Sequence, residues 1–164
     1  MVRQLTYWMA HAIILATLLL SPAKAKELAG VTLPDEITAG NNETLILNGL
    51  GLREKLWFDI YVGALYVPKT TSVVVDILSQ PGAMRIEMNF VYKEVEKEKL
   101  LKAWSEGFEK NQSRERMEKL QGRIATFYGY FTENAVKNDR FIFDYVPEQG
   151  TTTSKNGTVL GVIK

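Results

Sequence analysis

The sequence predicts an α+β protein with an antiparallel sheet and a helical layer on one face. Residues 44–67 have the pattern of two strands, residues 93–131 carry two apolar stripes at helical spacing, and residues 140–163 return to strand patterns. Strands that precede and follow a block of helices are typical of this class, because the segregated helices bury their apolar stripes on one sheet face. No repeat or linker divides the chain, so we expect one domain.

The first 25 residues are predicted to be a signal peptide. Arg3 supplies a positive charge, residues 10–20 (AHAIILATLLL) are apolar, and Ala23 and Ala25 fit the small-residue pattern before a cleavage site. The apolar run is shorter than the roughly 20 residues that a membrane-spanning helix needs. We therefore expect cleavage after Ala25 and a periplasmic or secreted product. An uncleaved N-terminal anchor is the alternative.

Composition excludes several classes of chemistry in the predicted domain, residues 26–164. Its net formal charge is −1 because Arg3 and Lys24 leave with the signal segment, so we expect no nucleic-acid partner. The chain has no cysteine, and its only histidine, His11, lies in the signal segment. Disulfides, a Ser-His or Cys-His nucleophile and the usual zinc sites are thereby excluded. We expect no cofactor, no metal and no membrane span after signal removal.

The N-terminal half of the domain is expected to be mostly strand. Residues 31–34 (VTLP) form a short strand, and residues 44–52 and 56–67 form two long strands linked around Arg53-Glu54-Lys55. In the second long strand, alternate residues from Leu56 to Tyr66 are apolar and predict a buried face. The opposite face is mixed. Residues 72–79 are expected to form a short helix, and residues 83–90 (AMRIEMNF) a strand with one solvated polar face.

Two amphipathic helices and three strands complete the domain. Ser113 is the expected N-cap of the second helix. The strands are residues 140–146, 151–155 and 158–163, the last two joined by the hairpin turn Asn156-Gly157. A terminal hairpin leaves an open sheet edge, so either this edge pairs within the sheet or the natural chain extends beyond Lys164. The helical stripes are Val95, Leu101, Trp104 and Phe108, then Met117, Leu120, Ile124, Phe127 and Phe131.

Arg53 and Tyr61 are the candidate ligand-binding residues, and no residue is assigned a catalytic role. Arg53 lies where the first long strand turns over into the mixed face that carries Asp59 and Tyr61. A guanidinium group at an apolar cavity suits a carboxylate or enolate oxygen, because its planar fork donates two hydrogen bonds. The alternative interpretation is that these residues bind no ligand. Arg53 and Asp59 would then be solvated, and Tyr61 would extend its hydroxyl group to the surface.

Residues 49–68 (GLGLREKLWFDIYVGALYVP) resemble the chalcone isomerase superfamily, and specifically its bacterial secreted chalcone-isomerase-like branch. The earlier VTLPDEI, the strand-helix-helix order and the closing NGTVLGVI are similar too. The resemblance covers nearly all of residues 26–164. It implies an open-faced β-sandwich, in which helices cover one face of a large antiparallel sheet and a ligand cleft lies between them.

The resemblance also implies roles for particular residues. Arg53 matches the family arginine that meets the oxyanion or carboxylate of the ligand. Tyr61 falls where plant enzymes have a threonine that helps to order the catalytic water, and a tyrosine there is typical of the fatty-acid-binding relatives. Val95 and Lys102 fall where plant enzymes carry a tyrosine and an asparagine, so the hydrogen-bonding set is incomplete. The C-terminal helices of the family would lie beyond Lys164.

Three functions remain open at this point. The favoured one is a non-catalytic binder of a fatty acid, or of another small apolar carboxylate or polyphenol-like anion, because it needs only Arg53 and Tyr61 at the mouth of a cleft. An isomerase acting on a chalcone-like enone, an intramolecular lyase, would lack two enolate donors, each worth about 2.7–4 kcal/mol of barrier. An envelope interaction scaffold without a ligand is the third, since fold does not fix function.

Overall fold

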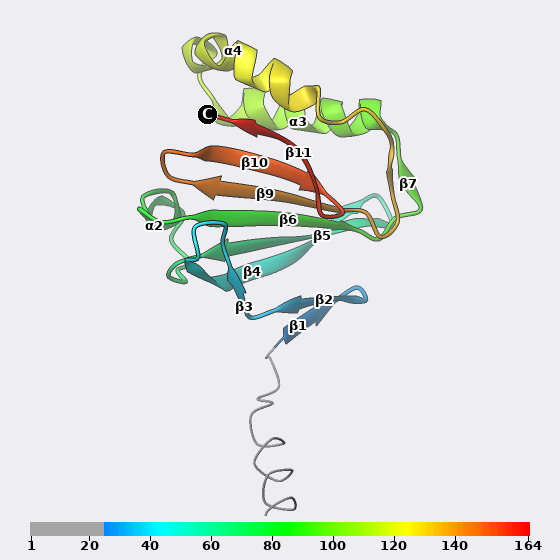
Figure 1. Ribbon diagram of the computed structural model, residues 1–164. Coiled ribbons are helices and arrows are strands. Elements are labelled where there is room, and N and C mark those ends of the chain that lie inside the picture. Colours follow the sequence, from blue (N-terminus) through cyan, green and yellow to red (C-terminus); the bar gives the residue numbers. More distant parts are fainter. Residues whose placement is uncertain (1–24) are drawn as a thin grey trace, which may run out of the picture.

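The computed structural model describes residues 25–164, beginning with strand β1 (Figure 1). Apart from Ala25, the predicted signal segment lies outside the described residues. No helix in the described range is long and apolar enough to cross a membrane. The strands are β1 (Ala25–Leu28), β2 (Val31–Pro34), β3 (Glu36–Thr38), β4 (Thr44–Lys55), β5 (Phe58–Val67), β6 (Met84–Phe90), β7 (Glu94–Val95), β8 (Ala135–Val136), β9 (Arg140–Val146), β10 (Gly150–Lys155) and β11 (Thr158–Ile163). The helices are α2 (Val74–Leu78), α3 (Lys97–Asn111) and α4 (Arg114–Tyr128).

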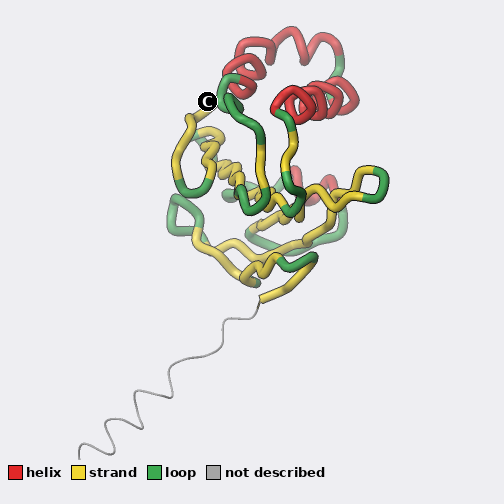
Figure 2. Tube along the Cα trace, turned by 90° about the vertical axis from the view of Figure 1, so that its right-hand side faces the viewer, coloured by secondary structure: helices red, strands yellow, loops and turns green. Residues whose placement is uncertain are grey.

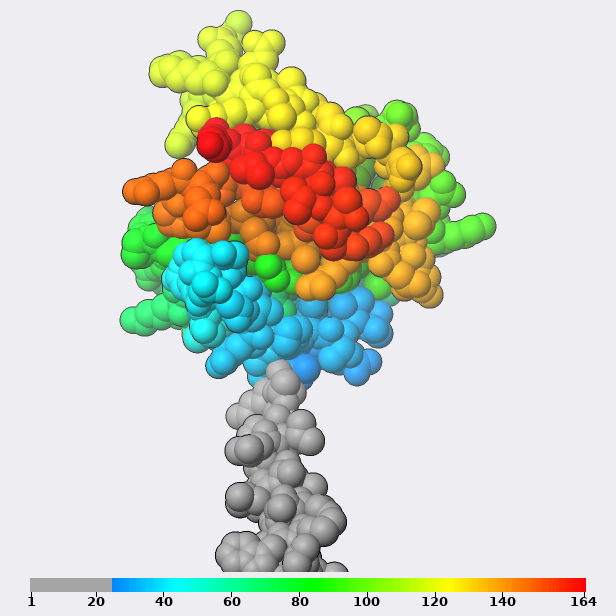
Figure 3. All heavy atoms as spheres, in the orientation of Figure 1, coloured from blue at the N-terminus to red at the C-terminus, as the bar shows by residue number. Residues whose placement is uncertain are grey.

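The predicted α+β class is confirmed. Seven antiparallel strands form one curled sheet in the order β11-β10-β9-β6-β5-β4-β3, and β11 is an edge strand. Helices α3 and α4 cover one face, which Figure 2 shows from the side. The β1–β2 hairpin lies across the opposite face at β4 and β5 (Figure 1). The last strand, β11, lies against α4 (Figure 3).

The helix-facing core is aromatic. The ring of Phe127 lies 5.0 Å from those of Trp104 and Phe131, and Trp104 also makes an edge contact with Phe143 at 5.5 Å. Edge-on pairs of this kind add to the free energy gained from burying apolar area. Leu101, Trp104 and Phe108 of the first predicted stripe therefore pack in this core, as do Phe127 and Phe131 of the second, although Phe131 follows the end of α4. Met117, Leu120 and Ile124 of the second stripe are only partly buried and do not belong to this core. One detail of the first stripe is wrong, because Val95 lies in β7 and α3 begins only at Lys97.

Two turn and capping predictions are confirmed. Ser113 Oγ accepts a hydrogen bond from the backbone N–H of Arg116 at 3.3 Å and so caps α4. Asn156 and Gly157, with φ of 51° and 85°, form the hairpin turn between β10 and β11. Both devices follow directly from local chemistry: a short polar side chain at a helix start, and residues that tolerate positive φ in a two-residue turn.

The turn between β4 and β5 lies elsewhere than predicted. Lys55 pairs with Phe58, so the loop consists of Leu56 and Trp57, and Arg53 lies inside β4, where it pairs with Tyr61. The prediction was wrong because charged residues are typical of turns and large apolar residues of strands. The predicted buried face is correspondingly shorter. Val62, Ala64 and Tyr66 are buried, whereas Leu56 is 77 % exposed.

The polar face of β6, predicted to be solvated, is buried. Glu87 is fully buried, and Arg140 Nε and Nη2 donate hydrogen bonds to its two carboxylate oxygens at 3.0 and 2.6 Å. Arg85 donates two hydrogen bonds to Asp144 at 2.6 and 2.7 Å. A buried carboxylate is tolerated only where such pairing offsets its desolvation. The charges of β6 are therefore neutralised by β9, which the sequence of β6 alone does not reveal.

Tyr66 adds a pH-dependent element to this face. Its side chain is fully buried on β5, and its hydroxyl donates a hydrogen bond to the backbone oxygen of Pro34 at 3.1 Å. Burial, and then the negative charge of Glu87, raise the pKa of Tyr66 to about 12. An unfolded tyrosine titrates near pH 10. The folded state therefore holds this proton more tightly than the unfolded state does.

We expect the free energy of unfolding to fall between about pH 10 and pH 12 through the titration of Tyr66, by at most about 3 kcal/mol. The contribution is fully present below pH 10, since the folded pKa is raised, and is lost as the pH rises through the folded pKa. Tyr66→Phe should cost about 1 kcal/mol at neutral pH, because the bond to Pro34 is lost. Urea unfolding of both proteins from pH 8 to pH 11.5 measures the difference, which should shrink with pH. Tyr145→Phe, at a partly exposed tyrosine, is the control. A difference that stays constant with pH would contradict this assignment.

Candidate functional site

A groove of about 800 Å³ lies between α3 and the neighbouring parts of β4, β5 and β6. Its volume is within the range of about 300–1,000 Å³ that small-molecule sites occupy. Its aromatic walls come from β5, from the end of β6, from the segment that follows and from α3. These aromatic side chains are Phe58, Tyr61, Phe90, Tyr92 and Trp104.

A β-bulge directs the outer part of β5 toward this groove. Arg53 pairs with Tyr61 and Glu54 with Asp59, so Ile60 has no partner in β4. An extra residue of this kind interrupts the regular alternation of side chains along a strand. Phe58, Ile60 and Tyr61 therefore all line the groove. Tyr61 pairs with Phe90 of β6 and lies on this side by regular alternation, whereas strict alternation would place Phe58 and Ile60 on the opposite face.

The bulge is held by the chain that follows β6. The backbone oxygen of Ile60 accepts hydrogen bonds from the N–H groups of Val91 and Tyr92 at 3.0 and 3.2 Å. The ring of Tyr92 in turn lies 5.3 Å from that of Phe58. The wall of the groove is thus built from two segments that are distant in sequence and joined through one carbonyl group.

The opposite wall is the N-terminal part of α3 with the residues just before it. Leu100 is the buried residue of this helix, and Ala103 and Trp104 follow one turn later on the groove side. Three- and four-residue spacing places these side chains on one helix face. Trp104 therefore serves both the aromatic core, through Phe127 and Phe143, and the groove.

The rim of the groove carries more unpaired basic than acidic groups. Arg53 and Lys55 of β4 line it, as does Lys102 of α3, and none of these three forms an ion pair with another described residue. Of the three acidic groups, Glu96 pairs with Lys99 at 2.9 Å, and Glu94 accepts a hydrogen bond from Asn134. Glu106 is the third. The rim can therefore offer two or three cations to an anionic group.

Arg53 and Tyr61 lie directly opposite each other on β4 and β5, and both line the groove. Tyr61 is half-buried, and its ring lies 5.5 Å from that of Phe90. Arg53 is exposed, so it stands at the rim and does not enter the apolar interior as the sequence led us to expect. Asp59, which was expected beside Tyr61, does not line the groove. Ligand binding by Arg53 and Tyr61 stays a prediction.

Val95 and Lys102, the positions matched to the plant tyrosine and asparagine, also line the groove. Valine offers no hydrogen bond, whereas the lysine offers a cation. The aromatic wall residues Phe58 and Tyr92 were not identified from the sequence. The bulge that turns Phe58 inward leaves no mark in the alternation, and Tyr92 lies outside any predicted strand. The helical spacing of Leu100 and Ala103 was visible but indicated only a buried face.

Metal chemistry receives no support from the described residues. No group of three or more histidine, cysteine, aspartate or glutamate side chains in residues 25–164 is arranged to hold a metal ion. The groove instead combines apolar walls with hydroxyl groups on Tyr61 and Tyr92 and a basic rim. Such a site can hold a small apolar anion without a cofactor.

Comparison with known proteins agrees with this architecture. A family model described as "Chalcone isomerase-like" matches residues 25–164. A solved structure of an Arabidopsis thaliana fatty-acid binding protein is similar to this chain, with a TM-score of 0.63 and 17 % sequence identity over 86 % of this chain and 82 % of the plant chain. A search of curated proteins finds no match. The matched fold is the curled antiparallel sheet with packed helices described above, and the chain belongs to the chalcone isomerase-like family.

Proposed function

We propose that this protein binds a fatty acid, or another small apolar carboxylate or phenolate, in the groove and catalyses no reaction there. The observation that carries the proposal is an aromatic groove of about 800 Å³ whose rim holds Arg53, Lys55 and Lys102, three cations without an ion pair among residues 25–164. The apolar part of the ligand would replace water along the aromatic walls, and the anionic group would lie at the rim beside Arg53. The similarity to a plant fatty-acid binding protein supports the same ligand class.

The energetics of such a complex divide into two parts. Each methylene group removed from water contributes about 0.8 kcal/mol, so a long alkyl chain supplies most of the affinity. Hydrogen bonds from Arg53 and Tyr61 to a carboxylate add less, because bonds to charged groups are worth about 1.5–3 kcal/mol and this rim is open to water. Affinity should therefore depend steeply on chain length and only moderately on the rim.

Catalysis is not proposed, because the groove lacks the tyrosine and asparagine donors that the resemblance would require. Val95 and Lys102 occupy the matched places. An enolate formed in the groove would find cations at the rim but no hydroxyl or amide donor from Val95 of β7 or Lys102 of α3.

We further propose that the protein is periplasmic and belongs to the bacterial secreted branch of its family. Arg3, the apolar residues 10–20 and the Ala23–Ala25 pattern support this proposal. Expression of the full chain in a Gram-negative cell, followed by fractionation and intact-mass measurement, tests it. We expect a periplasmic protein that begins at Lys26. A membrane-bound product with the mass of residues 1–164 would show a retained anchor instead.

Arg53→Ala should weaken the binding of a 16- or 18-carbon fatty acid by roughly 5–30-fold, equivalent to about 1–2 kcal/mol. The reason is that the guanidinium group no longer meets the carboxylate. Displacement of a fluorescent fatty acid, measured below its micelle concentration, gives the dissociation constant. Arg123→Ala, at an exposed arginine of α4 that does not line the groove, is the matched control and should bind normally.

Two outcomes of this experiment would contradict the proposal. Equal dissociation constants for Arg53→Ala and the parent protein would show that Arg53 does not contribute to binding the ligand. Turnover of a chalcone, followed as loss of its colour and abolished by Arg53→Ala, would replace the binder with an isomerase.

Ala103→Trp tests the groove itself. Ala103 lines the groove from α3 and is exposed, so a large side chain there should reduce the space for the ligand without disturbing the fold. Loss of two methylene contacts would weaken long-chain acids by about tenfold and short-chain acids less. The same titration measures this, and Ala125→Trp, at an exposed alanine of α4 outside the groove, is the control. Unchanged affinity for long chains in Ala103→Trp would place the ligand elsewhere.

A further inference from the structure

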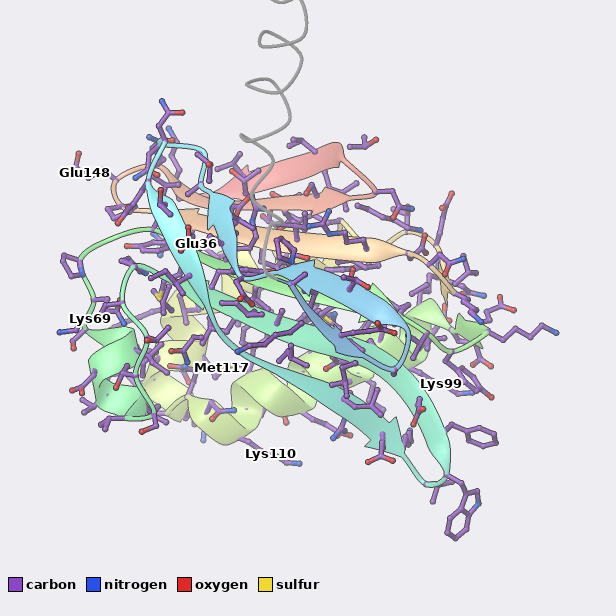
Figure 4. All side chains as sticks on the ribbon, turned by 90° about the horizontal axis from the view of Figure 1, so that it is seen from below. Glu36, Lys69, Lys99, Lys110, Met117 and Glu148 are labelled. Carbon is purple, nitrogen blue, oxygen red and sulfur yellow. The ribbon has the colours of Figure 1, made fainter. Side chains whose placement is uncertain are left out.

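The tip of the β4–β5 hairpin, Leu56 to Phe58, exposes a cluster of large apolar side chains to solvent. Trp57 is 87 % exposed and Leu56 is 77 % exposed, and Phe58 next to them is 48 % exposed. In Figure 4 the hairpin extends beyond the rest of the sheet. A large apolar group in water contributes nothing to folding, and clustered exposed apolar groups mark surfaces that meet a partner or a membrane.

The backbone at the tip is also unfavourable for these residues. Lys55 pairs with Phe58 across a loop of two residues, and Leu56 has a φ of 57°. Glycine, asparagine and aspartate are the residues that adopt this conformation readily in such loops, whereas leucine is strained there. The structure therefore gives no stabilising reason for Leu56 and Trp57 at these positions. Strain of this kind is characteristic of functional sites.

Charge divides between the two faces of the same hairpin. Arg53 and Lys55 line the groove, so they share the face that leads into it. Glu54 of β4 and Asp59 of β5 are opposite each other in the strand register, and neither lines the groove. The groove-side face of the hairpin is therefore basic, and the opposite face is acidic. Tryptophan is favoured at the boundary between water and lipid, and lysine or arginine beside it is attracted to anionic headgroups.

We propose that the tip of the β4–β5 hairpin docks on an anionic phospholipid surface. Leu56 and Trp57 enter the headgroup region, and Arg53 and Lys55 lie above anionic headgroups. Leu56 and Phe58 belong both to the tip and to the lining of the groove, so an apolar path connects the lipid with the site. Docking does not depend on the proposed ligand, whereas exchange of a fatty acid between bilayer and groove does.

Sedimentation of the purified protein with lipid vesicles tests the docking. The vesicles contain either phosphatidylcholine alone or phosphatidylcholine and phosphatidylglycerol at a ratio of roughly 7:3. We expect binding to the mixed vesicles, weakened by added salt. Trp57→Ser, which leaves the groove lining intact, should bind them about tenfold more weakly or worse. Val159→Ser, at a valine of β11 that is 61 % exposed and lies outside both the tip and the groove lining, is the control and should bind like the parent protein.

Leu56→Gly separates docking from stability. Glycine relieves the positive φ, so the melting temperature should rise while vesicle binding falls. The docking proposal is overturned if the parent protein remains in the supernatant when the mixed vesicles are pelleted. It is also overturned if Trp57→Ser sediments with the vesicles to the same extent as the parent protein. It is also overturned if ultracentrifugation shows a dimer that Trp57→Ser abolishes, since the tip would then contact a second copy. Titration of Trp57→Ser with a fatty acid in the absence of vesicles measures ligand binding in the groove separately. The docking proposal and the ligand proposal can therefore be contradicted independently.

Discussion

One inserted residue in β5 separates the part of the hairpin that fills the core from the part that lines the groove. Inward of the bulge at Ile60, regular pairing directs Val62, Ala64 and Tyr66 into the core under the β1–β2 hairpin. Outward of it, Phe58 lies on the groove side with α3, the same side that Tyr61 occupies just inward of the bulge. Because a strand otherwise alternates between faces, the groove could not have this continuous aromatic wall without the bulge.

The two faces of the sheet divide the chemistry between them. The face away from the helices holds the charges of β6, which Arg140 and Asp144 of β9 neutralise. The helix-facing side holds the aromatic cluster and the groove, and the groove-lining cations Arg53, Lys55 and Lys102 are all exposed, which places them at the rim. An uncompensated charge inside an apolar cavity is costly, so this arrangement leaves the interior suited to an apolar chain and the rim suited to its anionic end.

Local sequence patterns predicted the positions of helices, strands and turns better than they predicted which side chains are buried or what those side chains contact. Alternation, helical spacing, the Ser113 cap and the Asn156-Gly157 turn follow from neighbouring residues, and the family resemblance followed from the β4–β5 segment. The position of Glu87 did not, because its burial depends on Arg140, 53 residues away. The turn at Leu56 was missed because its residues contradict ordinary turn preferences. Arg53 and Tyr61 both line the groove, but Arg53 lies within β4 at the rim and not in a turn that enters the interior. The aromatic wall depends on a bulge that no local pattern shows.

Nuclear Overhauser contacts between the protein and a ¹³C-labelled long-chain fatty acid would test the groove most directly. The account predicts contacts from the alkyl chain to Phe58, Phe90 and Leu100, and none to Leu33 or Leu45 in the core on the other side of the sheet. Contacts to the opposite core, or a ligand that shows no contact with β5 and α3, would contradict it.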